Sequence, residues 1–514
     1  GQSNMVGSDS KASDIDKFPP FAGLGSPQQN IRFSYCIGRE NKLTSNGWNA
    51  LGPVNNVVGP ELSFARKVAN DSSGPIAIIK CAAGGTHLGG DWNPDNPSGF
   101  KMYPLAVDLV RKSLAELDRQ NIEYQLEGFM WHQGENDMFN EQYMANYGEN
   151  LKNFVQKWRD ELDAPALKFF VGELCTKTIW GMDLRPRMYA ISVGQESVTS
   201  TAPRVTYVPT SHVGVEIGGG VGLHYHYGTL GQLEHGINYA NAYLESVGVK
   251  PEQRAQLSRL PYADKSPVKL FVLAGHRNME GERAFTQNLS HDPDRKQLLR
   301  NQKQIPFRYQ LGGGYLASKN WEPLGPTGYY DTFGPELSFG EALRKTKDNI
   351  AIAKFTHSGS QIVDWTPEGS KAKSRNLYPQ FIQFIKDSIS YLKTRGHTVE
   401  LEGIFYHVGE NDMSFGPFRQ QSPAWIEALI RQSRIDLKQP DLRWFVFQQP
   451  PTDHEQVNSI DVTAELARVS KADPNWIHVR AFDLPKQDKQ LVLDESGIIA
   501  LGNLMAVEYQ NAEN

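Results

Sequence analysis

The chain has 514 residues, of which 39% are hydrophobic and 11% aromatic, enough apolar side chains for packed globular domains. Its net charge is only −5, and the basic residues are scattered along the chain. This excludes a basic face for nucleic acid or anionic lipid, so we expect no nucleic-acid partner. The longest apolar runs have the length of a strand, so we expect no membrane partner either.

The first predicted feature is the polar turn GQSNMVGSDS, residues 1–10, which is rich in turn-forming residues. The short apolar runs GPIAIIKCAAGG and LKFFVGEL, residues 74–85 and 167–174, predict β-strands. Residues 103–121 and 141–162 carry apolar side chains at helical spacing and predict helices. Strands alternate with helices, which favours a parallel sheet covered on both faces, with functional residues at the carboxyl ends of the strands.

Two sequence words occur twice in this chain. GPELSF at residues 59–64 recurs at 334–339, and GENDM at 134–138 recurs at 409–413. Both pairs are 275 residues apart (334 − 59 and 409 − 134), and weaker echoes lie between them in the same order, such as LEGFMWH and LEGIFYH. The repeats predict a tandem duplication, with a first copy over residues 1–248, a linker over 249–267 and a second copy over 268–514.

The second copy contains a strand ahead of its own version of the opening turn. The run VKLFVLAGHRNMEGE, residues 268–282, places an apolar strand directly before a turn that matches GQSNMVGS at an offset of 274. We therefore expect a first strand, and an export signal before it, ahead of Gly1. A secreted or periplasmic protein is the corresponding expectation.

The three cysteines, Cys36, Cys81 and Cys175, lie far apart and lack the spacing of metal ligands. They are predicted to be buried free thiols.

The words GQSNM, AAGGT, WHQGEND and HYGTLGQLEHG, in this order, resemble the SGNH-hydrolase superfamily, in particular its sialate O-acetylesterase and acetylxylan-esterase branch. The resemblance covers the first copy and, in degraded form, the second. It implies two tandem three-layer α/β/α domains of flavodoxin-like type with parallel central sheets. It also implies hydrolysis of acetyl esters on sugars without a metal or other cofactor. By position it implies Ser3 as nucleophile, His226 as general base, and Ser3, Gly84 and Gln133 as the oxyanion hole.

The chemistry requires residues of these types. A serine hydroxyl becomes a good nucleophile only when an imidazole takes its proton, so Ser3 needs a histidine within hydrogen-bond reach. The oxyanion of the tetrahedral intermediate needs fixed donors, which the N–H of Gly84 and the amide of Gln133 can supply.

Each of these residues also has a structural interpretation. Gly84 can form a tight turn after a strand, and Gln133 can cap a backbone group. His224 and His226 can form half of a metal site, although no Cys, Asp or Glu stands beside the pair. The spacing from His226 to Gly231 fits the family pattern better than the spacing from His224.

The second copy has lost all four proposed functional residues. It has Arg277 for Ser3, Ser358 for Gly84, Val408 for Gln133 and Val492 for His226. Other residues keep identical counterparts there: Glu61 and Glu336, Trp92 and Trp365, Glu135 and Glu410, Asn136 and Asn411, and Asp137 and Asp412. The second copy is therefore predicted to be a degenerate pseudo-domain that retains the fold and stabilises the first copy by intramolecular packing.

One position departs from the family pattern. The family usually has an aspartate three residues before the histidine, and this chain has Leu223 there. Glu216 or Glu135 could supply the acid instead. We favour a Ser-His dyad oriented by a backbone carbonyl, or an acid that the sequence does not reveal, over either glutamate.

The predicted function is a serine hydrolase that removes acetyl groups from an O-acetylated carbohydrate, a sialate or a plant or algal polysaccharide. The alternative is a non-catalytic carbohydrate-binding or scaffold protein derived from such an esterase, suggested by the missing aspartate. A thioesterase of the same superfamily is a third possibility, disfavoured because its usual opening has Asp before the serine.

Overall fold

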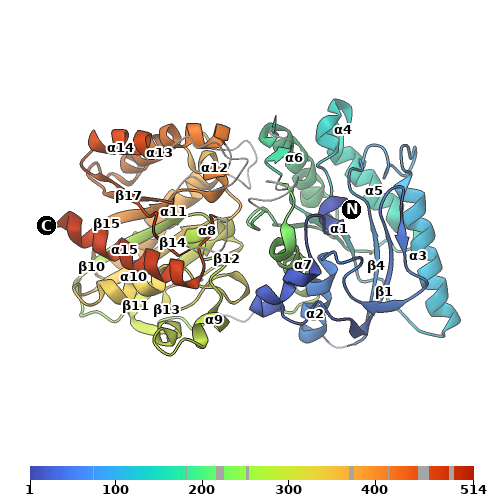
Figure 1. The fold of residues 1–514 in the computed structure, drawn as a ribbon, viewed down its shortest axis with the longest axis horizontal. Coiled ribbons are helices and arrows are strands. Elements are labelled where there is room, and N and C mark those ends of the chain that lie inside the picture. Colours follow the sequence, from blue (N-terminus) through green and yellow to red (C-terminus); the bar gives the residue numbers. More distant parts are fainter. Residues whose placement is uncertain are drawn as a thin grey trace. The chain divides into compact units, whose positions relative to one another are not determined.

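The computed structural model describes residues 1–72, 74–174, 176–179, 182–215, 225–250, 254–369, 376–414, 416–449, 462–485 and 491–513. The chain divides into two compact units, Gly1–Glu252 and Gln253–Asn514. We call them unit 1 and unit 2; Figure 1 shows unit 1 in blue to green and unit 2 in yellow to red.

Unit 1 alternates strands and helices. Its helices are α1 (Ser3–Val6), α2 (Glu61–Asp71), α3 (Met102–Arg119), α4 (Glu141–Ala145), α5 (Tyr147–Glu161), α6 (Arg185–Thr201) and α7 (Gly228–Ser246). Its strands are β1 (Gln28–Ile37), β2 (Leu43–Thr44), β3 (Asn49–Leu51), β4 (Ile76–Ala82), β5 (Phe129–Trp131), β6 (Phe169–Gly172), β7 (Thr178–Ile179), β8 (Met182–Asp183) and β9 (Val205–Val208). The helix expected over residues 141–162 is two helices, because the helical conformation stops at Asn146.

The main strands of unit 1 are parallel and belong to two sheets. β4 pairs with β1 in one sheet, and β5, β6 and β9 form the other in that order. The antiparallel strands β2 and β3 pair with opposite ends of β1, and β7 and β8 form a separate hairpin.

Unit 2 repeats this order of elements. Its helices are α8 (Arg277–Glu280), α9 (Thr286–Ser290), α10 (Glu336–Leu343), α11 (Leu377–Thr394), α12 (Glu410–Met413), α13 (Gly416–Leu437), α14 (Val462–Lys471) and α15 (Glu495–Glu513). Its strands are β10 (Pro267–Gly275), β11 (Gln302–Leu311), β12 (Leu316–Ala317), β13 (Glu322–Leu324), β14 (Ile350–Thr356), β15 (Thr398–His407), β16 (Trp444–Gln448) and β17 (Trp476–Arg480).

The sheet of unit 2 is continuous. Its parallel strands run in the order β11, β14, β10, β15, β16 and β17, and the short antiparallel strands β12 and β13 pair with β11. β10 lies between β14 and β15, whose counterparts in unit 1 are β4 and β5. The expected α/β class with parallel sheets is confirmed.

The central strand β10 shows why this sheet is buried on both faces. Successive side chains of a strand point to opposite faces. Leu270 and Val272 belong to one hydrophobic core together with residues of α11 and α13, while Phe271 and Leu273 belong to a second core together with residues of α10 and α15. A strand buried on both faces reads as a continuous apolar run, as VKLFVLAG does.

A helix pair in each unit packs closely in the same way. α7 packs on α2 in unit 1, and α15 packs on α10 in unit 2, where Figure 1 shows α15 beside α10. The close approach is made possible by Gly236 on α7 and Gly502 on α15, because a methyl group on either would overlap backbone and side-chain atoms of the partner helix.

Part of the segment expected to be a linker belongs to unit 2. Leu260 and Tyr262 are buried in its hydrophobic core, and the Tyr262 hydroxyl donates to the Ile350 carbonyl at 2.7 Å. The N–H of Leu257 donates to the Trp321 carbonyl at 2.9 Å. The expected linker over 249–267 is therefore too long, because burial of its apolar residues fixes 257–262 to unit 2.

Two of the cysteines can be located. Cys36 is buried and Cys81 is partly exposed, and both are free thiols on neighbouring strands. Cys175 lies outside the described residues.

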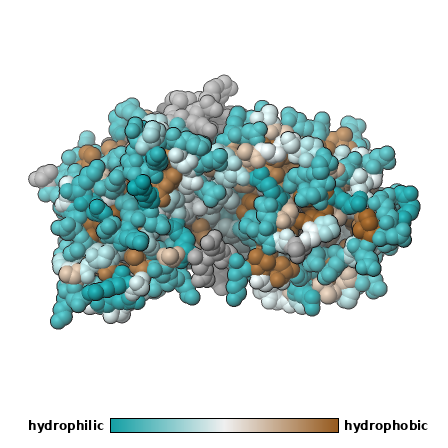
Figure 2. All heavy atoms as spheres, turned by 90° about the horizontal axis from the view of Figure 1, so that it is seen from below, coloured by the Kyte–Doolittle hydropathy of each residue, from teal (hydrophilic) through white to brown (hydrophobic). Residues whose placement is uncertain are grey.

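The described helices include none with both the length and the hydropathy of a membrane span. On the face drawn in Figure 2, hydrophilic side chains cover most of the surface of each unit, and hydrophobic residues form smaller areas between them.

Candidate functional site

The opening turn of unit 1 lies at the carboxyl end of β4. The N–H of Ala83, just after β4, donates to the carbonyl of Gly1 at 3.0 Å, and α1 begins two residues later at Ser3. Gly84 follows Ala83, and a methyl group placed on it would lie 3.5 Å from Ser3 Cβ. The structure therefore places Ser3 and Gly84 side by side, from segments about 80 residues apart in the sequence.

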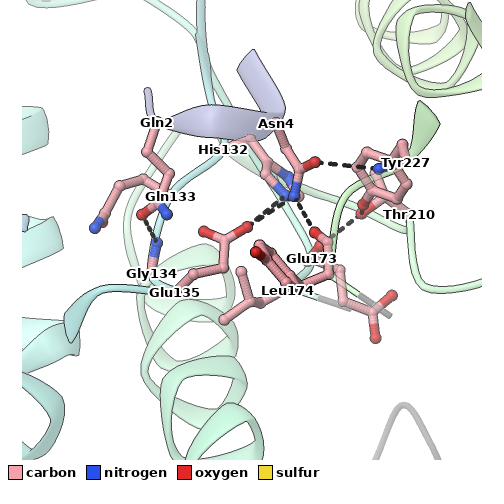
Figure 3. Close-up of polar contacts among 12 residues, drawn as sticks. Gln2, Asn4, His132, Gln133, Gly134, Glu135, Glu173, Leu174, Thr210 and Tyr227 are labelled. Carbon is pink, nitrogen blue, oxygen red and sulfur yellow. Dashed lines mark hydrogen bonds and ion pairs between the residues drawn. The ribbon is translucent and has the colours of Figure 1, made fainter. Parts of the chain in front are cut away.

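The residue after Ser3 fixes the segment that carries His226. Asn4 is fully buried; its Nδ2 donates to the carbonyl of Tyr225 at 2.8 Å, and its Oδ1 accepts the N–H of Tyr227 at 3.3 Å. Figure 3 shows the Asn4 side chain directed toward Tyr227. An amide can donate and accept at once, so this one side chain holds the backbone on both sides of His226.

A second pair of hydrogen bonds fixes the other end of the turn. The N–H of Lys11 donates to Thr229 Oγ1 at 2.8 Å, and the Thr229 hydroxyl lies 3.3 Å from the carbonyl of Lys11. Thr229 is in the first turn of α7. The turn over residues 3–11 is thus attached at both ends to residues 225–229.

Asp9 lies within this turn and contacts His226. Its Oδ2 is 2.8 Å from His226 Nδ1, and the His226 side chain is 10% exposed. The hydrogen bond from His226 lowers the pKa of Asp9, against a smaller opposing effect of burial. A carboxylate can only accept, so Nδ1 carries a proton, and in the neutral ring the lone pair is then on Nε2.

Sequence reasoning missed Asp9, although a signal for it existed. Asp9 stands in the opening turn, six residues after Ser3, and Arg283 takes its place in the second copy at the offset of 274. It therefore changes together with the four positions predicted to be functional. Asp9 and His226 are 217 residues apart, far from the usual position of the acid three residues before the histidine.

The other residues that the sequence offered near the histidine are not seen to contact His226 among the described residues. Glu216, Leu223 and His224 lie outside the described residues. Glu135 is fully buried, and its Oε1 accepts from Asn4 Nδ2 at 2.9 Å. Desolvation by burial raises the pKa of Glu135. Within the described part of the chain no hydrogen bond joins Glu135 to His226, so this glutamate supports Asn4 (Figure 3).

The N–H groups beside the Ser3 hydroxyl are unoccupied. Among the described residues, no acceptor is hydrogen-bonded to the N–H of Ser3 or of Gly84, and no hydrogen bond joins the Ser3 hydroxyl to His226. Catalytic hydrogen bonds often tighten only when substrate is bound. Two adjacent unoccupied N–H groups beside a serine are the donors that an oxyanion requires.

Gln133 follows β5 but already has partners. Its Nε2 donates to the carbonyl of Thr86 at 3.0 Å and to Asp137 Oδ2 at 2.5 Å, and its Oε1 accepts from the Tyr147 hydroxyl at 3.2 Å. Gln133 would have to exchange one of these acceptors for an oxyanion, so its role in the oxyanion hole stays a prediction.

The corresponding place in unit 2 is filled by an ion pair. The Arg277 guanidinium is fully buried and lies 2.6 Å from Glu282 Oε1. The carboxylate of Glu410 accepts the backbone N–H groups of Arg277 and Asn278 at 3.0 Å each. The N–H at the position of Ser3 is therefore occupied in unit 2.

The clamp on the histidine segment is retained in unit 2. Asn278 Nδ2 donates to the carbonyl of Leu491 at 2.9 Å, and its Oδ1 accepts the N–H of Leu493 at 2.7 Å. The residue between them is Val492, which agrees with the pairing of His226 with Val492 in the aligned copies.

The described residues contain no cluster of three or more His, Cys, Asp or Glu side chains that could hold a metal ion. The alternative zinc site at His224 and His226 is not tested by this, since His224 lies outside those residues.

A family model described as carbohydrate esterase, sialic acid-specific acetylesterase, matches residues 1–245 and again residues 267–511. The two segments fit a tandem duplication, and the resemblance stated from the sequence is confirmed. A probable carbohydrate esterase of Arabidopsis thaliana is 27% identical over 113 residues, which is 21% of this chain and 39% of the length of that relative.

Three solved structures are similar to parts of this chain. A protein from Arabidopsis thaliana is 19% identical over 48% of this chain and 98% of its own, with a TM-score of 0.36. A carbohydrate acetylesterase from Xanthomonas citri is 17% identical over 47% of this chain and 56% of its own, with a TM-score of 0.35. An aryl esterase of M. smegmatis is 14% identical over 48% of this chain and all of its own, with a TM-score of 0.27.

Proposed function

The chain belongs to the family of carbohydrate esterases described as sialic acid-specific acetylesterases, and from this premise we propose that unit 1 is a serine esterase that removes acetyl groups from carbohydrates. The observation that carries the proposal is the 2.8 Å contact between Asp9 and His226, held beside Ser3 by the Asn4 clamp. The proposed roles are Ser3 as nucleophile, His226 as general base and Asp9 as the acid that orients the imidazole.

The reaction begins with proton transfer. Asp9 accepts the Nδ1 proton of His226, so Nε2 can take the proton of the Ser3 hydroxyl while Ser3 Oγ attacks the acetyl carbonyl carbon. The resulting tetrahedral intermediate carries its negative charge on the former carbonyl oxygen. The N–H groups of Ser3 and Gly84 stabilise that charge, and loss of one such donor typically costs about 10²- to 10³-fold in kcat.

The second half of the reaction releases the sugar and then acetate. The protonated His226 gives its proton to the sugar oxygen as the bond from the acetyl carbon to that oxygen breaks, which leaves acetyl on Ser3. Water, deprotonated by His226, then attacks the acetyl group and restores the Ser3 hydroxyl. No electron is exchanged with a cofactor in these steps.

Unit 2 does not share this activity in our proposal, because Arg277 replaces the nucleophile and Val492 replaces the base. The alternative of a wholly non-catalytic carbohydrate-binding protein was suggested by the missing aspartate. Asp9 supplies a carboxylate at the imidazole, so that reason no longer applies.

The test is hydrolysis of p-nitrophenyl acetate and of an O-acetylated sugar by the full chain. We expect turnover by the wild type, loss of turnover in Ser3→Ala, and labelling of Ser3 alone by a serine-directed phosphonate. Label on Ser358 or elsewhere in unit 2, or full activity in Ser3→Ala, would contradict the proposal.

Chelation provides a control for the mechanism. Treatment with EDTA is expected to leave turnover unchanged, because Ser3, His226 and Asp9 need no metal. Activity that is lost with EDTA and restored by zinc would favour a metal site at His224 and His226 instead.

A further inference from the structure

Two cysteines of unit 1 face each other across neighbouring strands. Cys36 on β1 and Cys81 on β4 are partners in the parallel register of these strands, one residue before each strand ends. Partners in register point to the same face of a sheet, and the two thiols form a hydrogen bond. Neighbouring strands lie about 4.8 Å apart, within the range of about 4.4–6.8 Å between Cα atoms that a disulfide joins. The two sulfur atoms are therefore within reach of a bond to each other.

The two thiols of this pair differ in acidity. The hydrogen bond with the Cys81 thiol lowers the pKa of Cys36 to about 7, against the effect of burial and with the help of the Lys42 ammonium. The same hydrogen bond, together with burial, raises the pKa of Cys81, so this thiol stays protonated at neutral pH. A peroxide reacts with the thiolate form, so Cys36 is the thiol that is oxidised and Cys81 is the thiol that can resolve it.

The pair is reduced and accessible to a small oxidant. Both cysteines are free thiols. Cys36 is buried, whereas Cys81 beside it is partly exposed. Hydrogen peroxide is little larger than water, so it can reach the pair from the side of Cys81.

The strand that carries Cys81 leads directly to the proposed oxyanion hole. The Cys81 carbonyl accepts from the Gly1 amino group at 3.1 Å, and the N–H of Ala83 donates to the Gly1 carbonyl at 3.0 Å. The next residue is Gly84, beside Ser3. A change at Cys81 therefore acts on the segment that places Gly84 against the proposed nucleophile.

Unit 2 has no thiol at the corresponding place. The register of β11 with β14 pairs Gln310 with Phe355. These residues correspond to Cys36 and Cys81, because both lie 274 positions further on (310 − 36 and 355 − 81), the offset of the opening turns. Phe355 belongs to a hydrophobic core of unit 2. The thiol pair thus occurs only in the unit that carries the proposed nucleophile.

We propose that Cys36 and Cys81 are a redox site, in which hydrogen peroxide joins the two thiols in a reversible disulfide and this bond lowers the esterase activity of unit 1. Formation of the disulfide is independent of the proposed function, whereas its effect on activity rests on that function.

The oxidation proceeds in two balanced steps. The Cys36 thiolate attacks one oxygen of the peroxide, the O–O bond breaks, and the other oxygen takes up a proton and leaves as water, so Cys36 becomes a sulfenic acid. The sulfur of Cys81 then attacks the sulfur of Cys36, the S–O bond breaks, and the hydroxyl leaves with the thiol proton as a second water. The two thiols lose two electrons, and the peroxide gains them. A thiol reductant such as dithiothreitol restores both thiols.

The new bond moves the end of β4. A disulfide holds its two Cβ atoms about 3.8 Å apart, which is about an ångström less than the spacing of neighbouring strands. The ends of β1 and β4 must therefore draw together as the bond forms, and Gly84 moves with the end of β4. A displacement of about 1 Å in an active site can cost about 10²-fold in rate.

The experiment counts free thiols and measures turnover of p-nitrophenyl acetate on the same samples of the full chain. Wild type, Cys36→Ser, Cys81→Ser and Cys175→Ser are treated with a small molar excess of hydrogen peroxide, with and without dithiothreitol afterwards. Thiols are titrated after denaturation, and peptide mapping locates any disulfide. Cys175→Ser is the matched control, because it removes the third cysteine of the chain.

We expect peroxide to lower the thiol count of the wild type from three to one, with the disulfide between Cys36 and Cys81. Its turnover should fall by about 10²-fold and return with dithiothreitol. Cys175→Ser should lose and regain turnover in the same way. Cys36→Ser should keep its turnover under peroxide, and Cys81→Ser should leave a sulfenic acid on Cys36 that dimedone labels.

The outcomes separate this inference from the proposed function. A wild type that keeps three free thiols under peroxide, or a disulfide that includes Cys175, would overturn the redox site, and this count needs no variant to fold. A disulfide between Cys36 and Cys81 with unchanged turnover would show that the bond does not control the esterase. If the untreated wild type does not hydrolyse the ester, the proposed function fails together with the effect on activity, and the thiol count still decides whether the disulfide forms.

Discussion

At the scale of single residues, Asn4 and Asp9 show how the opening turn builds a site. Asn4 holds the backbone of Tyr225 and Tyr227, and Asn278 does the same in unit 2, so this asparagine belongs to the shared fold. Asp9 has no such counterpart, since Arg283 replaces it. Comparison of the two units thus separates a residue that both units use to fold the turn from a residue that only unit 1 has.

Replacement of Asp9 by asparagine should strongly lower activity. An amide can present its nitrogen to His226 Nδ1, which shifts the proton to Nε2 and removes the base. In a Ser-His-Asp triad this substitution costs about 10⁴-fold in kcat, and we expect a loss of about 10²- to 10⁴-fold in turnover of p-nitrophenyl acetate. Asp14→Asn, at an exposed ion pair with Lys17, is the control and should retain full activity. If Asp9→Asn kept the wild-type kcat, Asp9 would not be needed for the reaction, and a Ser-His dyad would be the better mechanism.

The same pair makes a prediction for the pH dependence of stability. Because the hydrogen bond from His226 lowers the pKa of Asp9, the contribution of Asp9 to the free energy of unfolding is full above the unfolded value of about 4 and declines as pH falls through the folded value. Urea unfolding of wild type and Asp9→Asn at several pH values should therefore give a difference that shrinks only in the acid range. If the difference in the free energy of unfolding between wild type and Asp9→Asn instead grew as the pH fell, the predicted direction would be wrong.

At the scale of elements, the repeated word GPELSF lies where two helices meet. Ser63 Oγ donates to the Leu233 carbonyl of α7, and Ser338 Oγ donates to the Ile499 carbonyl of α15. The glutamate of the word is in a buried ion pair in both units, with Lys80 and with Lys354 at 2.8 Å. The serine holds the helix that begins in this word against the last helix of the unit, and the glutamate ties the same helix to β4 or β14, which gives both copies the same reason to keep the word.

Gly502→Ala should destabilise unit 2. The added methyl group would overlap Ser338 Oγ and the carbonyl of Pro335, so α15 must move away from α10. Overpacking of this kind costs about 1–3 kcal/mol in the free energy of unfolding, measured as a lower urea midpoint with an unchanged m-value. Gly416→Ala is the control, because nothing lies within 4 Å of a methyl group there. Equal midpoints for the two variants would show that the helix contact is not tight.

At the scale of the whole molecule, the two units share a fold but differ at the site. In unit 2 a buried arginine and glutamate fill the nucleophile position, and Glu410 occupies the N–H groups that an oxyanion would need. Loss of either partner would leave a buried charge unpaired, which costs several kcal/mol in the free energy of unfolding. The arginine and the glutamate therefore depend on each other. In unit 2 the turn that corresponds to the proposed nucleophile turn is therefore closed by its own side chains.

We expect unit 2 to stabilise unit 1 by packing, which separation of the units can test. A protease site placed at the boundary between Glu252 and Gln253 leaves Leu260 and Tyr262 with their own core, whereas a cut at Pro261 would not. Interfaces between domains commonly bury about 600–1,500 Å², so isolated unit 1 should melt at a lower temperature than the uncut chain. Turnover of p-nitrophenyl acetate should persist below that temperature.

The opposite result has a clear meaning. Equal melting temperatures and equal turnover of the small ester, with loss of activity only on a polymeric substrate, would make unit 2 an independent unit for binding glycan. The uncut chain that carries the protease site is the control for the insertion itself.

The sequence by itself determined the duplication, because two words recur at one offset, and the α/β class, because the spacing of apolar side chains is a property of neighbouring residues. Only the tertiary structure brought Asp9 to His226, since their contact joins residues 217 apart and depends on which turn faces which strand end. The same holds for the Thr86 carbonyl already bound by Gln133 and for the attachment of Tyr262 to unit 2. Each of these contacts joins residues that are far apart in the sequence. Such contacts depend on which loops come together once the strands have paired, and local sequence patterns do not determine that.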